Sequence, residues 1–226
     1  MLSHILSQLK GTREYDVLCE MEKVYSKIET SQETWKKASN ISCPEFCGKC
    51  CVLFEPDINK SEALYLAAWL IENQPKVAGS ILAGTFKTKK DVLKEGCILF
   101  DPDNKYHCTV YGGRCLICRL FGFSGDYGRH GEHRWKPCKF MPAEILEHHL
   151  PALEHRQYEE NELKKIFSAL PPIMSDFTEQ AIALDPNEAF TFPLRDALPK
   201  AIEKIEFLLY AARGKDPEDP SLPLTT

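Results

Sequence analysis

The segment CPEFCGKCC, residues 43–51, places four cysteines within nine residues. Such crowding constrains the fold, because clustered thiols bind metals, form disulfides or act in redox chemistry. The start of the chain, MLSHILSQLKGTREYD, lacks the basic leader and apolar run of an export signal, so we expect a cytoplasmic protein. Clustered cysteines in a reducing compartment bind metals more often than they form structural disulfides. The ten cysteines therefore predict a soluble metal-binding protein, with a disulfide scaffold or buried apolar thiols as alternatives.

The first cluster combines a metal-binding spacing with an adjacent pair. Cys43, Cys47 and Cys50 are spaced C-x3-C-x2-C, which lets one turn of backbone direct their sulfurs toward one metal. Gly48 is expected to supply the positive φ of a tight turn. Cys51 follows Cys50 directly, and adjacent side chains of an extended chain point to opposite faces. We therefore expect Cys50 and Cys51 to serve different metals, or Cys51 to have another partner.

Five further cysteines follow in the central third of the chain. They lie on an expected hairpin, on the short helix after it and at the end of a glycine-rich loop: Cys97, Cys108, Cys115, Cys118 and Cys138. The nine clustered thiols exceed the four that one zinc ion or one cubane cluster takes. The count allows two four-thiolate centres with one spare thiol, or one centre together with free, reactive thiols.

These motifs resemble those of the YkgJ-type cysteine-cluster family, a zinc- or iron-chelating domain. The resemblance rests on CPEFCGKCC, GCILF, HCTVY and RCLICRLFGF, and it covers roughly residues 43–125. Carried over residue by residue, it implies the ligands Cys43, Cys47, Cys50, Cys51, Cys97, Cys108 and Cys118. Cys115 stands where the family commonly has proline, and Cys138 has no counterpart that we can place. These two thiols could complete a second centre or could be incidental.

The thiol-only set suits an iron–sulfur cluster, [4Fe-4S] in particular, and zinc is the alternative cofactor. Either centre carries a negative formal charge that would attract the cations beside the ligands: Lys49, Arg114, Arg119 and Lys139. We expect a structural, electron-transfer or sensing role. The alternatives are a zinc-binding module and a metal-dependent enzyme that modifies another protein, since some relatives in the family that this chain resembles are flagellin lysine N-methylases. No nucleophile–base pair or cofactor fingerprint identifies catalytic residues.

Hydrophobic periodicity predicts a mainly α fold with a small β-hairpin, an α+β arrangement in which helices brace a cysteine-rich core. The first helix is expected over residues 13–39, with Cys19 on its face, and the next between a cap at Asn59 or Ser61 and Pro75. Further helices are expected over residues 76–95, 114–121, 142–149, 154–170 and 194–213, and a hairpin over residues 97–111. We treat residues 1–226 as one domain, with a metal-binding core at residues 43–138, flanking helices at residues 13–39 and 142–213, and a flexible tail at residues 214–226.

Charge and hydropathy limit the expected partners. The net charge of −5 argues against general nucleic-acid binding. No apolar stretch approaches the roughly 20 residues that span a bilayer, so no membrane association is expected. The expected partners are metal ions, together with a protein that the sequence leaves unidentified.

Overall fold

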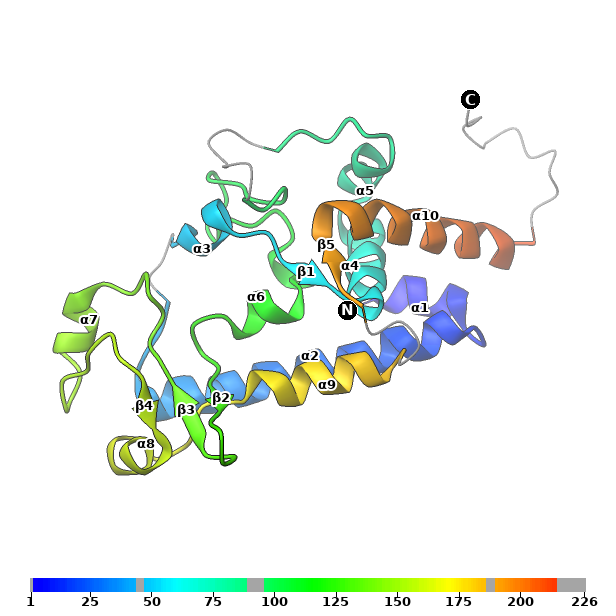
Figure 1. The fold of residues 1–226 in the computed structure, drawn as a ribbon. Helices are drawn as coiled ribbons and strands as arrows, with labels where there is room; N and C mark the ends of the chain where they lie inside the picture. The colour runs from blue at the N-terminus through cyan, green and yellow to red at the C-terminus, as the bar shows by residue number, and fades with distance from the viewer. Residues whose placement is uncertain (1, 44–46, 89–95, 186–189, 215–226) are drawn as a thin grey trace.

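The computed structural model describes residues 2–43, 47–88, 96–185 and 190–214. This described part is mainly helical and has two small antiparallel sheets, which confirms the fold class predicted from the sequence (Figure 1). The helices are α1 (Ser3–Leu9), α2 (Arg13–Ser39), α3 (Lys49–Leu53), α4 (Lys60–Asn73), α5 (Pro75–Leu82), the 3-10 helix η1 (Tyr111–Gly113), α6 (Leu116–Leu120), α7 (Ala143–Glu147), α8 (Glu160–Ile166), α9 (Met174–Ala183) and α10 (Leu194–Ala212). The strands are β1 (Asp57–Ile58), which pairs with β5 (Phe192–Pro193), and β2 (Asp126–Tyr127), β3 (His133–Trp135) and β4 (Tyr158–Glu159), which form the second sheet.

The long helix α2 connects two hydrophobic cores. It begins after Thr12, whose hydroxyl accepts a hydrogen bond from the amide of Tyr15 at 3.1 Å, and it ends at Asn40, which has a left-handed φ of 52°. These boundaries confirm the helix predicted over residues 13–39. A helix of 27 residues is about 40 Å long, so its N-terminal part packs in the larger core while Trp35 reaches the smaller one.

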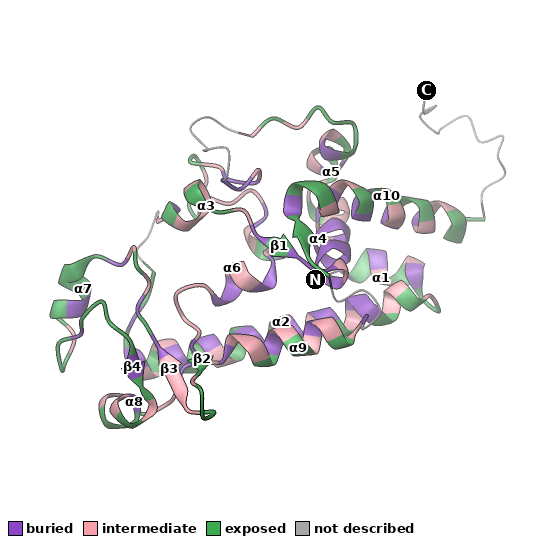
Figure 2. Ribbon diagram, viewed as in Figure 1, coloured by how far each residue is buried: buried purple, intermediate pink, exposed green. Residues whose placement is uncertain are grey.

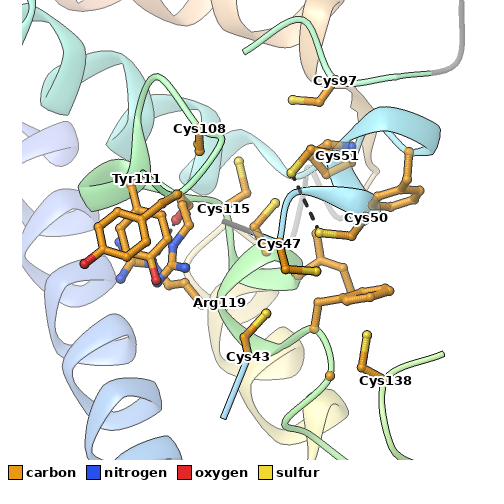
Figure 3. Close-up of a pocket in the computed structure, with 18 of the residues that line it drawn as sticks. Cys43, Cys47, Cys50, Cys51, Cys97, Cys108, Tyr111, Cys115, Arg119 and Cys138 are labelled. Carbon is orange, nitrogen blue, oxygen red and sulfur yellow. Dashed lines mark hydrogen bonds between the residues drawn. The ribbon is translucent and has the colours of Figure 1, made fainter. Parts of the chain in front are cut away.

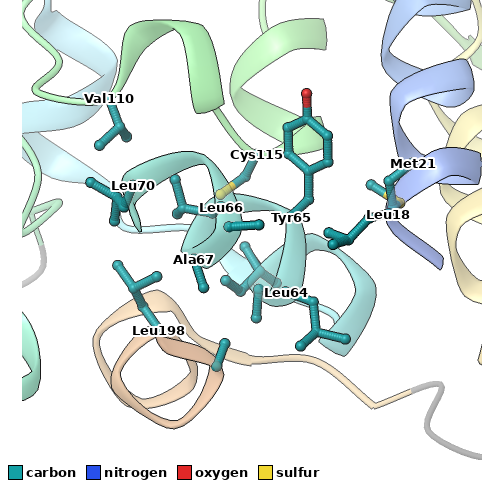
Figure 4. Close-up of a cluster of buried hydrophobic side chains, with 14 of the residues drawn as sticks. Leu18, Met21, Leu64, Tyr65, Leu66, Ala67, Leu70, Val110, Cys115 and Leu198 are labelled. Carbon is teal, nitrogen blue, oxygen red and sulfur yellow. The ribbon is translucent and has the colours of Figure 1, made fainter. Parts of the chain in front are cut away.

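Helix α4 is the centre of the larger core. Residues 61–68 are all buried, so the helix is enclosed on every side (Figure 2). Figure 4 shows its side chains between Leu18 of α2, Leu198 of α10, and Val110 and Cys115 of the cysteine-rich segment. This packing connects the cysteine-rich segment directly to the hydrophobic core.

The start of α4 has the geometry of a capping box. The side-chain oxygen of Asn59 accepts a hydrogen bond from the amide of Glu62 at 2.9 Å, and the Glu62 carboxylate accepts one from the amide of Asn59 at 3.2 Å. Of the two predicted caps, Asn59 is therefore the one used. Helix α5 begins with Pro75 and ends at Leu82, which is shorter than the helix predicted over residues 76–95, and residues 89–95 lie outside the described part of the chain.

Helix α10 and the β1–β5 pair close the larger core. Helix α10 confirms the helix predicted over residues 194–213, and its buried residues Leu198 and Ile205 pack with α4. Strand β5 precedes α10 and pairs with β1, with Phe192 opposite Ile58. Because β1 follows the first cysteine cluster closely in the sequence, this pairing anchors the cluster to the C-terminal helix.

The smaller core lies at the other end of α2. The ring of Trp35 lies edge-on to Trp135 of β3, with centroids 5.3 Å apart, and to Phe167, with centroids 4.8 Å apart. Strand β3 pairs with β2 and with β4, where Tyr158 is also buried. The glycine-rich segment before Cys138, predicted as a loop, therefore contains two paired strands, and this pairing gives Trp135 a buried position.

Several other elements differ from the sequence expectations. The hairpin expected over residues 97–111 is reduced to one antiparallel bridge between Phe100 and Cys108, followed by η1. The helix expected over residues 154–170 is shorter in the structure. Helix α8 covers only Glu160–Ile166 and directly follows strand β4. No sequence pattern predicted α1 or α9, because each buries only two side chains and so carries little periodic signal.

No helix in the described part of the chain is both long and apolar enough to cross a membrane. Gly214 is the last described residue, so the tail predicted over residues 214–226 lies almost entirely outside the described part.

We expect Trp35→Ala to lower the free energy of unfolding by about 3–5 kcal/mol, because it removes a fully buried indole from the smaller core. Trp35→Phe should cost only about 1–2 kcal/mol, since phenylalanine keeps the aromatic contacts and the indole N–H has no hydrogen-bond partner among the described residues. Phe207→Ala, at an exposed position on α10, is the control and should have an effect within about 0.5 kcal/mol. Urea unfolding followed by circular dichroism measures all three, and equal losses for Trp35→Ala and Phe207→Ala would contradict the assignment of the smaller core.

Candidate metal centre

Nine of the ten cysteines line one cavity between the two hydrophobic cores. The cavity has a volume of about 440 Å³, and the thiols that line it are Cys43, Cys47, Cys50, Cys51, Cys97, Cys108, Cys115, Cys118 and Cys138. Figure 3 shows the labelled cysteines, all of these except Cys118, projecting from α3, from the start of α6 and from the connecting segments. All ten cysteines carry free thiols, and Cys19 lies on α2 outside the cavity. The structure thus brings together all nine cysteines predicted as site residues.

Cys50 and Cys51 lie in the short helix α3, and their Sγ atoms are 3.8 Å apart. The expectation that these two side chains point to opposite faces of an extended chain is therefore wrong. Adjacent residues of a helix are rotated by only about 100°, so both thiols reach the same cavity.

Gly48 acts by its small size, not by a special backbone conformation. Its φ is −105°, outside the left-handed region that the sequence analysis expected. A Cβ atom at Gly48 would lie 2.4 Å from the Cβ of His107, which itself has a φ of 52°. The missing side chain lets the first cysteine cluster lie against the segment that carries Cys108.

Backbone hydrogen bonds join the first cluster to the second. The amide of Cys97 donates to the carbonyl of Cys51 at 2.9 Å. Glu55 extends this link, because its carboxylate accepts hydrogen bonds from the amide of Ile98 at 3.3 Å and from the guanidinium of Arg195 at 2.5 Å. These contacts hold Cys97 beside α3.

The first turn of helix α6, which carries Cys118, is hydrogen-bonded to the carboxylate of Glu62. The amide of Leu116 donates to Glu62 Oε1 at 2.7 Å, while Oε2 takes part in the capping box of α4. Glu62 is only 6% exposed, and this burial raises the pKa of its carboxyl. One buried carboxylate therefore fixes the start of two helices. Glu62 was not among the predicted site residues, although the pattern N-x-x-E from Asn59 to Glu62 is a capping-box signal that could have identified it.

Arg119 fixes the other end of α6. Its guanidinium donates to the carbonyls of Arg114 at 2.8 Å and Gly112 at 2.7 Å, and to the carboxylate of Glu29 on α2 at 2.6 Å. It also lies over the ring of Tyr25, 4.0 Å from the centroid. With its side chain only 3% exposed, Arg119 is a buried clamp for α6 as well as a positive charge in the cavity wall.

Cys138 approaches the cavity from the smaller core, against which it packs. Gly122, in the turn after α6, has a φ of 79°, and a Cβ atom there would lie 3.0 Å from the Cβ of Cys138. The turn therefore leaves room for Cys138, and the amide of Met141 donates to the Cys138 carbonyl at 2.9 Å.

Burial makes several of the thiols weak acids in the metal-free chain. It raises the pKa of Cys43 to about 12 and that of Cys108 to about 11, and it raises the pKa of Cys97 as well. Neighbouring thiols add to these increases, because a nearby negative charge disfavours ionisation. These groups are therefore protonated at neutral pH, and a bound metal has to displace their protons.

Cys50 ionises more readily. A hydrogen bond from the Cys51 thiol lowers the pKa of Cys50 to about 7, and the same interaction raises the pKa of Cys51. The positive charge of Arg114 also favours the thiolate form of Cys50. The Nε of Arg114 is buried without a hydrogen-bond partner among the described residues, and the guanidinium carbon lies 3.6 Å above the centroid of the Tyr111 ring. Arg114 is thus a cavity-lining donor that suits a thiolate.

The rest of the cavity wall is mostly apolar and aromatic, and no His, Asp or Glu contributes to its described lining. As the side chains stand, no three His, Cys, Asp or Glu groups among the described residues are arranged to hold a metal ion. Coordination would therefore bring the Sγ atoms closer together than they lie in this structure. The donor chemistry nevertheless fits a thiolate-bound metal, because soft sulfur ligands surround one enclosed space.

We expect Arg119→Met to lower the free energy of unfolding of the metal-free chain by about 2–4 kcal/mol, because the carbonyls of Gly112 and Arg114 lose a buried donor. Glu29→Gln is the control: its carboxylate is 64% exposed, so the loss should stay below about 1 kcal/mol. Chemical denaturation in the presence of a chelator makes the comparison. Similar losses for the two variants would contradict the role of Arg119 as a clamp.

Comparison with known protein families agrees with this geometry. The family model described as "CxxCxxCC: Putative zinc- or iron-chelating domain" matches residues 42–161. This match covers more than half of the chain, includes all nine thiols of the cavity and extends beyond the range over which the sequence motifs showed the resemblance. No curated protein and no solved structure matches the chain. The chain therefore belongs to the CxxCxxCC family of zinc- or iron-chelating domains.

Proposed function

We propose that this chain holds one or two iron–sulfur centres of the [4Fe-4S] type through the thiolates of its central cavity. Residues 43–138 form the metal-binding core in this proposal, and the helices within residues 13–39 and 142–213 brace it. The observation that carries the proposal is the donor set: nine free thiols share one cavity whose described lining has no His, Asp or Glu. Cysteine thiolates are the usual ligands of iron–sulfur clusters. The role would be structural, electron-transferring or sensing.

The size and surroundings of the cavity also support a cluster. Its volume of about 440 Å³ falls in the range of small-molecule pockets, about 300–1,000 Å³, and so exceeds the space between the ligands of a single ion. Phe54, Phe121 and Phe123 contribute apolar surface to its wall. An apolar shell limits access of water to a cluster and tunes its reduction potential.

Zinc is the second candidate, and the closed inner part of the cavity favours it. Cys97 is only 8% exposed. Structural zinc sites are tetrahedral, with all four positions filled by protein ligands and none left for water or substrate. A zinc centre here would contribute folding free energy without redox chemistry.

Metal analysis after anaerobic purification distinguishes the two candidates. Iron with a matching amount of acid-labile sulfide and broad visible absorption would support the iron–sulfur proposal, whereas a colourless protein with stoichiometric zinc would support the alternative. A freshly purified protein with neither metal, and unable to take up either, would refute both.

We expect Cys47→Ser and Cys118→Ser each to lower the bound metal and the thermal stability, because bound metal contributes to folding free energy. Cys19→Ser is the matched control, since its thiol lies on α2 outside the cavity, and it should retain the full metal content. Unchanged metal in both cavity variants would remove Cys47 and Cys118 from the set of ligands.

Metal binding should strengthen as pH rises, because the thiols whose pKa is raised must lose protons to bind. Arg114→Gln removes a charge that lowers the pKa of Cys50 and Cys108, so half-saturation should move to a higher pH by up to about one unit. Arg156→Gln is the control, since Arg156 pairs with Glu162 on the surface and does not line the cavity. Anaerobic cobalt(II) binding as a function of pH measures the shift. The same pH dependence in both variants would exclude this role of Arg114.

A further inference from the structure

We propose that the thiols divide into two neighbouring four-thiolate sites and one packing residue. The outer site consists of Cys43, Cys47, Cys50 and Cys138, and the inner site consists of Cys51, Cys97, Cys108 and Cys118. Cys115 is the ninth thiol and binds no metal. This inference rests on the proposed metal binding and goes further by assigning each thiol to a site.

The two hydrophobic cores divide the thiols in this way. Cys97 is a buried member of the larger core, and Cys51, Cys108 and Cys118 pack against that same core. Cys138 packs instead against the smaller core. The inner thiols and Cys138 therefore reach the cavity from different walls, and Cys43, Cys47 and Cys50 are not among the described residues that pack against either core.

Figure 3 shows the same division in space. Cys51, Cys97 and Cys108 lie in the upper part of the view, whereas Cys43 and Cys138 lie in the lower part. Cys43 is exposed and Cys97 is buried, whereas the other six thiols of the two sites are intermediate in exposure. The outer site is thus the one nearer to solvent.

The adjacent thiols of α3 are assigned to different sites. Their Sγ atoms are 3.8 Å apart, so the two sites lie side by side. Cys51 is tied to the inner set, because its carbonyl accepts the hydrogen bond from the amide of Cys97 at 2.9 Å. Cys50 is assigned to the outer set, because Cys51 packs against the larger core and Cys50 is not among the described residues that do so.

Arg114 is a cation in the wall of the cavity that both sites share. Its buried Nε has no partner among the described residues and can donate to a thiolate. Two thiolate centres in one cavity would concentrate negative charge, and a shared cation reduces their repulsion.

Cys115 has the surroundings of a core residue. It is 2% exposed, and Figure 4 shows it next to Leu66 of α4. Its thiol is hydrogen-bonded to that of Cys118, so it can donate its S–H to the sulfur of a metal-bound Cys118. Such hydrogen bonds orient and tune the ligands of a metal.

Cobalt(II) added anaerobically to the metal-free, full-length protein tests the division, because its thiolate charge-transfer bands report the number of sites and of Co–S bonds. The unmodified protein should bind two equivalents, each with four sulfurs. Cys50→Ser and Cys138→Ser should each lose the cobalt ion bound at the outer site. The variant that carries both substitutions should therefore still bind one equivalent of cobalt. Cys51→Ser should lose the other equivalent, so that combining it with Cys138→Ser leaves no tight site.

The adjacent substitutions Cys50→Ser and Cys51→Ser form the matched pair, since both lie in α3 and neither residue is a buried member of a core. Cys115→Ser and Cys19→Ser should keep both equivalents, and circular dichroism verifies that every variant is folded. Loss of the same equivalent by Cys50→Ser and Cys51→Ser would overturn the division, as would binding of one or three equivalents by the unmodified protein.

The protein as purified provides a second readout. Cys138→Ser should retain about half of the iron or zinc found in the unmodified protein, whereas full retention would remove Cys138 from the outer site. Failure of the unmodified protein to bind cobalt, iron or zinc would refute the proposed function itself. Metal binding with another stoichiometry or another grouping would refute only the division into two sites.

Discussion

The buried clamp on helix α6 is the constraint on which the cysteine site depends. Arg119 ties the helix to α2 and to the turn before it, and Glu62 ties its first turn to the start of α4. A helix of five residues is not stable on its own, so these contacts set its position. The location of Cys118 relative to the other thiols therefore follows from two buried ionisable side chains that are not metal ligands.

The cavity exists because two hydrophobic cores share one long helix. Helix α2 contributes to the larger core through its N-terminal part and to the smaller core through Trp35. The segments that carry the thiols cross the space between the cores, and their described residues contain little regular structure: α3, one isolated bridge, η1 and α6. Metal bound there would connect the two cores directly, and its binding free energy would contribute to the stability of the fold.

The proposed outer and inner sites differ in exposure, and this difference suggests a division of roles. A site that includes the exposed Cys43 can exchange metal or react with solvent-borne species. A site that includes the buried Cys97 is protected by the larger core. Their adjacency through Cys50 and Cys51 would let a change at the outer site alter the electrostatic environment of the inner one.

The sequence by itself determined the strongly periodic or chemically distinctive elements: the helix over residues 13–39, the capped helix after Asn59, the final helix and the nine clustered cysteines. These follow from local patterns of apolar residues, caps and ligand spacing. Only the tertiary structure decided that Cys50 and Cys51 share a helix, that Gly48 is needed for space beside His107, and that Cys138 meets the other thiols from a second core. Those features depend on contacts between residues far apart in the chain, and neither periodicity nor spacing encodes such contacts.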